Sequence, residues 1–136
     1  MTLNTVKGFL DNTEGKELAK IAKQCSKLGP CLEIGTYCGK SALIMGSVCK
    51  KNKNILFTVD HHTGSEEHQL GEEYHDSDLF DQNISCFNSL PEFLRNLRES
   101  NLANFVLPIV ADSEEISKNL EIPLGMVFID GGHSRE

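Results

Sequence analysis

The chain has 136 residues, of which 39% are apolar and 24% charged, a composition that fits one globular domain and excludes a disordered chain. No stretch approaches the ~18 consecutive apolar residues of a membrane span, and the first residues lack the basic and apolar regions of a signal peptide. With 13 Lys and Arg against 20 Asp and Glu, the net charge of −7 disfavours nucleic-acid binding, which needs clustered cations. We therefore expect a single cytoplasmic domain over residues 1–136, with no nucleic-acid or membrane partner.

The predicted elements alternate between helix and strand. Apolar residues at helical spacing predict a first helix over residues 13–28, which Gly29 and Pro30 end. Four apolar runs predict strands, and helical patterns lie between them: strands at 31–35, 55–60, 105–110 and 126–130, helices at 39–50, 89–100 and 112–120. Ser89 with Glu92 three residues later predicts a capping box, and Asp112 predicts another helix cap.

Strands without polar alternation, linked by helices, are typical of a parallel sheet that is buried on both faces. The sequence therefore predicts an α/β fold, a doubly wound parallel sheet. Such sheets bind ligands beyond the carboxyl ends of their strands. Three of the four predicted strands carry a carboxylate near that end. The five cysteines are odd in number and contain no C-x-x-C pair, so we interpret them as reduced thiols.

The segment LEIGTYCGKS, Leu32–Ser41, is the most informative part of the chain. Gly35 and Gly39 allow a tight turn from strand to helix, in which the backbone approaches a ligand closely. The spacing is E-x-G-x-x-x-G, not the G-x-G-x-x-G of dinucleotide sites. Glu33 would repel a diphosphate but attract a cationic amine, so the turn favours a cofactor with an ammonium and a sulfonium. The alternative is an ordinary glycine turn beside an exposed glutamate.

Carboxylates also follow the second and third predicted strands. Asp60 comes about 20 to 25 positions after the turn, where an acidic residue can accept both hydroxyls of a ribose. Asp112 could accept from an adenine amino group, cap the next helix, or do both. For Asp60 the alternative is an aspartate that begins an ordinary loop.

The segment LEIGTYCGKSALIM resembles motif I of the class I S-adenosylmethionine-dependent methyltransferases, in the form found in catechol O-methyltransferase-like enzymes. The residues IDGGHS, 129–134, resemble the D-G-G-H signature of a bacterial group of uncharacterised or sugar-directed methyltransferases. The resemblance covers nearly all of the chain after the first helix. It implies a Rossmann-like sheet with strand order 3-2-1-4, S-adenosylmethionine as cofactor, and O-methylation of a small molecule or sugar.

The resemblance also implies a role for each matching position. The methionine end of the cofactor would contact the turn and the start of the next helix: Glu33, Gly35, Thr36, Tyr37, Gly39 and Ser41. Asp60 would hold the ribose, and the adenine would be contacted by His61, Asp112 and Ser113. Asp130 would be catalytic as the ligand of Mg²⁺, a hard ion that orients and acidifies a hydroxyl. His133 would be a catalytic base or a substrate contact, or else a polar loop residue.

Residues 61–83 are polar, acidic and rich in histidine. The spacing of their histidines and carboxylates matches no recognised metal site. We expect instead a mobile cap near the cofactor and acceptor sites.

The sequence departs from the family in supplying only the first four strands of the sheet, without strands five to seven. The fourth strand would then be an apolar edge with unpaired backbone groups. We expect a second copy of the chain, in a homo-oligomer, or a missing C-terminal segment to cover it. Two other functions stay open: a module that binds the cofactor without turnover, and an NAD(P)-linked oxidoreductase, which Glu33 and the glycine spacing disfavour.

Overall fold

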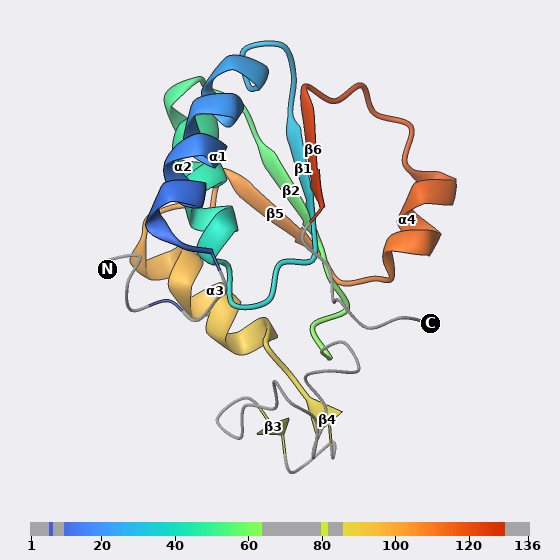
Figure 1. Cartoon of the computed structure of the whole chain (residues 1–136). Helices are drawn as coiled ribbons and strands as arrows, with labels where there is room; N and C mark the ends of the chain where they lie inside the picture. Colours follow the sequence, from blue (N-terminus) through green and yellow to red (C-terminus); the bar gives the residue numbers. More distant parts are fainter. Residues whose placement is uncertain (1–5, 7–9, 64–79, 82–85, 130–136) are drawn as a thin grey trace.

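The structure is a computed structural model of the chain, and it describes residue 6 and residues 10–63, 80–81 and 86–129 (Figure 1). Asp130, His133 and most of the stretch 61–83 lie outside the described residues. The elements in chain order are α1 (Asn12–Cys25), β1 (Cys31–Ile34), α2 (Lys40–Lys51), β2 (Leu56–Val59), β3 (Phe80–Asp81), β4 (Cys86–Phe87), α3 (Leu90–Glu99), β5 (Val106–Ile109), α4 (Ser113–Asn119) and β6 (Met126–Ile129).

Four strands form one parallel sheet in the order β5-β2-β1-β6, which confirms the expected order 3-2-1-4. The register aligns the last residues of all four strands. Ile34 pairs with Val59 on one side and with Ile129 on the other, and Val59 pairs with Ile109. The carboxyl ends therefore lie at one edge of the sheet, where parallel α/β sheets bind their ligands.

The core lies between the sheet and the helices α1, α2 and α3, which occupy the same side of it in Figure 1. Each element contributes a side chain with no exposed surface: Ala22 from α1, Met45 from α2, Leu56 from β2 and Phe93 from α3. Burial of such apolar side chains is the main favourable contribution to folding.

The start and end of α1 follow from local sequence. The Asp11 side chain accepts a hydrogen bond of 2.8 Å from the backbone N–H of Glu14 and so caps the helix. Leu18 and Ala22 face the core, as their spacing predicts. The helix ends at Cys25, three residues before the predicted end.

The opposite face of the sheet is less covered than the sequence predicts. Val127 and Ile129 of β6 are 49% and 71% exposed, and Leu107 of β5 is 40% exposed. Helix α4 is the described helix on this side in Figure 1, and it buries none of its residues. The expectation of strands buried on both faces is thus wrong for β5 and β6, because no described helix packs closely over them.

The expected capping box at the start of α3 is also wrong. Ser89 occupies the N-cap position, but its side chain makes no capping bond, and Glu92 forms an ion pair with Arg95. Asp112 likewise precedes α4, but its side chain accepts no capping hydrogen bond. The antiparallel pair β3–β4 was not expected from the polar composition of this region.

Among the described residues, no helix combines the length and the apolar character of a membrane span. Cys25, Cys31, Cys38 and Cys49 are free thiols, and the last three are buried.

Candidate functional site

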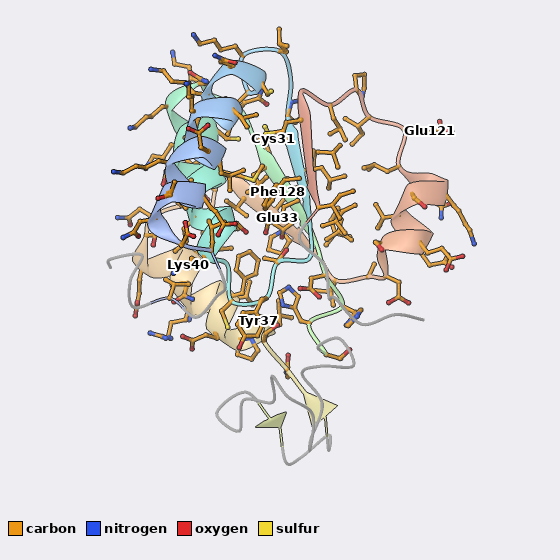
Figure 2. The ribbon with its side chains drawn as sticks, viewed as in Figure 1. Cys31, Glu33, Tyr37, Lys40, Glu121 and Phe128 are labelled. Carbon is orange, nitrogen blue, oxygen red and sulfur yellow. The ribbon has the colours of Figure 1, made fainter. Side chains whose placement is uncertain are left out.

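The carboxyl end of β1 leads into a tight turn, residues 35–39, which ends where α2 begins. Gly35, Tyr37 and Gly39 have positive φ angles of 88°, 53° and 98°. Glycine adopts this conformation at little cost, whereas a residue such as Tyr37 keeps it only where neighbours hold it. Figure 2 shows Tyr37 beyond the carboxyl edge of the sheet, and Glu33 within the sheet.

Asp60, the residue after β2, holds this turn from the neighbouring strand. Its Oδ2 atom accepts hydrogen bonds of 2.8 Å from the backbone N–H groups of both Thr36 and Tyr37. Its Oδ1 atom accepts one of 2.9 Å from the backbone N–H of His62. A carboxylate has about four acceptor positions, so three of them serve the backbone and about one is left for a ligand. Asp60 therefore stabilises the turn, and its role at a ribose stays a prediction.

Glu33 and Ser41 form a buried pair beneath the turn. Glu33 has no exposed surface, and Ser41 is 4% exposed. The Ser41 hydroxyl donates a hydrogen bond to the Glu33 carboxylate and so joins β1 to the first turn of α2. The alternative of an exposed glutamate is wrong, since Glu33 lies inside the fold. A buried carboxylate needs such hydrogen bonds to offset its lost hydration.

Helix α3 supports the turn from below. Asn96 is fully buried, and its Nδ2 atom donates a hydrogen bond of 2.8 Å to the backbone carbonyl of Cys38. The ring of Phe93 lies directly against Gly39. The sequence predicts only that Phe93 lies in a helix over residues 89–100, and its contact with the turn depends on how α3 packs.

His62 is a site residue that the sequence analysis missed. It is 2% exposed, its Nδ1 atom lies 2.8 Å from the Ser89 hydroxyl, and its ring stacks on Phe93 at 5.5 Å between centroids. Burial lowers the pKa of His62, while the nearby charge of Asp60 opposes this effect and His61 adds to it. The imidazole is therefore neutral at neutral pH. A histidine inside a polar stretch gave no signal of burial.

The residues expected at the adenine lie at the ends of β2 and β5. The backbone N–H of Asp60 donates to the carbonyl of Ile109 at 3.1 Å, and the backbone carbonyl of Asp60 accepts from the N–H of Ala111 at 3.3 Å. These two bonds join the ends of the two strands. His61 is half-buried, and its Nδ1 atom accepts from the backbone N–H of Thr63. Asp112 and Ser113 are exposed.

The structure thus brings together the turn, Asp60 and the start of α2, with Glu33 and Ser41 beneath them. In the ranges that the structure describes, no group of three or more His, Cys, Asp and Glu side chains is arranged to hold a metal ion. The expected metal ligand and catalytic residue Asp130, and the expected catalytic residue His133, lie outside those ranges.

The turn also contains a buried polar atom. The Thr36 hydroxyl is buried and has no hydrogen-bond partner among the described residues. Buried polar groups are normally paired with protein, water or a ligand. In addition, α2 has no acidic residue in its first turn, so the positive end of its dipole favours an anionic group such as a carboxylate.

Comparison with known proteins identifies a family and a shared fold. Residues 32–136 match the family described as "Methyltransferase domain". The fold is similar to that of the O-methyltransferase TomG from Streptomyces achromogenes, solved in complex with SAM, with 20% identity and a TM-score of 0.63 over 90% of this chain and 45% of that one.

Two further solved structures share the fold. An O-methyltransferase from Bacillus cereus in complex with SAH has 19% identity and a TM-score of 0.60, over 94% of this chain and 48% of that one. The SAH-bound methyltransferase PaMTH1 from Podospora anserina has 18% identity and a TM-score of 0.62, over 90% and 42%. The chain therefore spans about half the length of these structures.

Proposed function

Since the chain belongs to a family of methyltransferase domains, we propose that it binds S-adenosylmethionine at the turn between β1 and α2 and methylates a hydroxyl of a small molecule or sugar. One observation carries the proposal. The turn 35–39 is held by Asp60 at the carboxyl edge of the sheet, with the start of a helix beside it. When bound, the cofactor supplies an electrophilic methyl group on a sulfonium.

The residues of the turn fit such a cofactor. The unpartnered Thr36 hydroxyl and the start of α2 offer hydrogen bonds and a positive dipole to the methionine carboxylate. Glu33 and Ser41, buried beneath, join β1 to α2 and so hold the turn. The remaining acceptor position of Asp60 is available to one ribose hydroxyl.

Other residues are proposed for the adenine side and the acceptor side of the site. His61, Asp112 and Ser113 are proposed to flank the adenine, because they follow β2 and β5 at the same edge as the turn. His133 is proposed to take the proton of the acceptor hydroxyl or to hold the acceptor, and Asp130 to bind Mg²⁺. These roles rest on the IDGGHS motif.

The first test is calorimetric titration of the purified chain with S-adenosylhomocysteine, followed by a methyl-transfer assay on a panel of hydroxyl compounds. Micromolar binding with turnover supports the proposal. Binding without turnover would favour the second candidate, a module that holds the cofactor only. Binding of NADH without S-adenosylhomocysteine would contradict both and indicate an oxidoreductase.

The contribution of Mg²⁺ is tested separately. With one proposed ligand, the metal should affect methyl transfer more than cofactor binding. Removing Mg²⁺, or the Asp130→Asn substitution, is therefore expected to lower the methylation rate and leave the affinity for S-adenosylhomocysteine unchanged. Tight binding of Mg²⁺ by the chain alone would contradict a single ligand.

The proposal includes partners and location. We expect one domain over residues 1–136, located in the cytoplasm, with a small-molecule acceptor and no nucleic-acid partner, given the net charge of −7. Val127 and Ile129 of the edge strand β6 are exposed apolar side chains. We expect either a second copy of the chain or a C-terminal segment to pack on them.

A further inference from the structure

The turn 35–39 has two supports, and His62 touches both. On the strand side, the backbone N–H of His62 donates to Asp60, the carboxylate that holds the amides of Thr36 and Tyr37. On the helix side, the His62 carbonyl accepts a hydrogen bond of 2.8 Å from the backbone N–H of Ser89, at the start of α3.

The imidazole strengthens the link to the helix. Its Nδ1 atom lies 2.8 Å from the Ser89 hydroxyl, and the ring planes of His62 and Phe93 are 20° from parallel. Phe93 in turn packs against Gly39, the last residue of the turn. A chain of contacts therefore runs from Asp60 through His62 to Phe93 and back to the turn.

The backbone of His62 shows that this position is held by its surroundings. Its φ angle of 62° is in the left-handed region, which a residue other than glycine occupies at a cost. The contacts to Asp60, Ser89 and Phe93 offset that cost. His62 is 2% exposed, so its ring acts through contacts inside the fold, to the Ser89 hydroxyl and to Phe93.

We propose that His62 is a positioning residue. Through Asp60, which accepts from the amides of Thr36 and Tyr37, and through Phe93, it keeps the turn 35–39 in the conformation that binds the ligand. The identity of that ligand rests on the proposed function. Ser89 belongs to the same chain of contacts, which explains why its hydroxyl bonds to His62 and does not cap α3.

The test uses His62→Asn, which tolerates the left-handed backbone but removes the ring, and Ser89→Ala, which removes one hydroxyl. Both variants are expected to bind S-adenosylhomocysteine more weakly, by about tenfold for His62→Asn and about threefold for Ser89→Ala, as buried hydrogen bonds are lost. The control is Leu18→Ala in α1, which is 5% exposed. It should lower the urea midpoint of unfolding and leave the dissociation constant within about twofold.

A second readout does not depend on the ligand. Hydrogen exchange of the Thr36 and Tyr37 amides is expected to be about tenfold faster in His62→Asn, because Asp60 is less well held, while the Leu56 amide of β2 exchanges as in the wild type. If His62→Asn does not fold, Ser89→Ala provides both readouts. Unchanged affinity and unchanged exchange in the variants, or equal loss of affinity in Leu18→Ala, would overturn the proposal.

The two proposals fail in different ways. A wild-type chain that does not bind S-adenosylhomocysteine contradicts the proposed cofactor, while the exchange rates of Thr36 and Tyr37 still decide the role of His62. Binding by the wild type with equal affinity and equal exchange in His62→Asn contradicts the role of His62 alone.

Discussion

The ring of Phe93 fills the space that a side chain at residue 39 would need: a Cβ atom on Gly39 would lie 2.4 Å from Cδ1 of Phe93. The φ angle of 98° at Gly39 independently disfavours a side chain there. These two constraints come from α3 and from the turn itself. Together they require glycine where the turn meets α2.

Gly39→Ala is therefore expected to destabilise the fold by about 2–4 kcal/mol, from overpacking and from the left-handed backbone. Urea unfolding followed by circular dichroism measures the change. Gly15→Ala is the matched control, because residue 15 lies in α1 and a Cβ there meets only the flexible side-chain ends of Ile44 at 3.1 Å and Leu10 at 3.8 Å. Its effect should stay within about 1 kcal/mol. Equal losses in the two variants would show that Phe93 does not restrict residue 39.

Asp60 is expected to be sensitive even to a substitution of the same shape. Asp60→Asn places an amide NH2 group opposite a backbone N–H, of Thr36 and Tyr37 or of His62, whichever way the amide is turned. Both Asp60→Asn and Asp60→Ala should weaken binding of S-adenosylhomocysteine by about 1–3 kcal/mol.

Calorimetric titration compares these variants with Asp11→Asn, the same chemical change at the N-cap of α1, where asparagine is equally suitable. Asp11→Asn should leave the affinity unchanged. An unchanged dissociation constant in Asp60→Ala would remove Asp60 from the site.

The buried His62 makes a specific contribution to the pH dependence of stability. Burial lowers its pKa below the ordinary value of 6.5, so under mildly acidic conditions the unfolded chain binds a proton that the folded chain does not. The free energy of unfolding should fall as the pH drops below 6.5 and level off below the folded pKa. Above that range the contribution of His62 does not change.

Urea unfolding between pH 7.5 and about 4.5 tests this by comparing the wild type with His62→Asn, which retains the other four histidines. The wild type should lose more stability than the variant over this range. Parallel curves for the two proteins would contradict a lowered pKa at His62.

Apolar side chains of β6 are exposed, and a second copy of the chain that covers them would make the protein self-associate. Val127→Lys is expected to shift the mass measured by light scattering toward the monomer, because a charge at a dry interface is unfavourable. Ile21→Lys on α1 is the control, since Ile21 and Val127 are exposed to a similar extent, 46% and 49%. A wild-type chain that is monomeric at every concentration would indicate that no second copy covers β6.

Much of the fold could be predicted from local sequence. The apolar runs marked all four strands of the parallel sheet, and the spacing of residues such as Leu18 and Ala22 marked the helices, because each pattern reflects a repeating backbone geometry. The resemblance of LEIGTYCGKSALIM to motif I supplied the strand order, which the structure confirms. The glycine spacing and the acidic residue after the second strand pointed to Gly35, Gly39 and Asp60, and the structure places Asp60 against the turn 35–39.

The partners of these residues could not be predicted, because they depend on contacts between distant segments. Ser89 precedes α3 as expected, yet its hydroxyl bonds to His62, which is 27 positions away in the sequence. In the same way, the sequence left open whether Glu33 is exposed, and the structure buries it with Ser41 of α2 hydrogen-bonded to it. Helix capping rules consider only residues that are near in the sequence. The burial of a side chain depends on which distant segments pack against it.

The sequence by itself determined the order of the elements and the chemistry at the end of each strand, since both follow from residue type and periodicity. Only the tertiary structure decided that Asp60 spends three hydrogen bonds on the backbone, and that Phe93 and Asn96 support the turn from beneath. The physical reason is that hydrogen bonds and close contacts act over a few ångströms. Segments far apart in the chain come within that distance only when the sheet and its helices have packed.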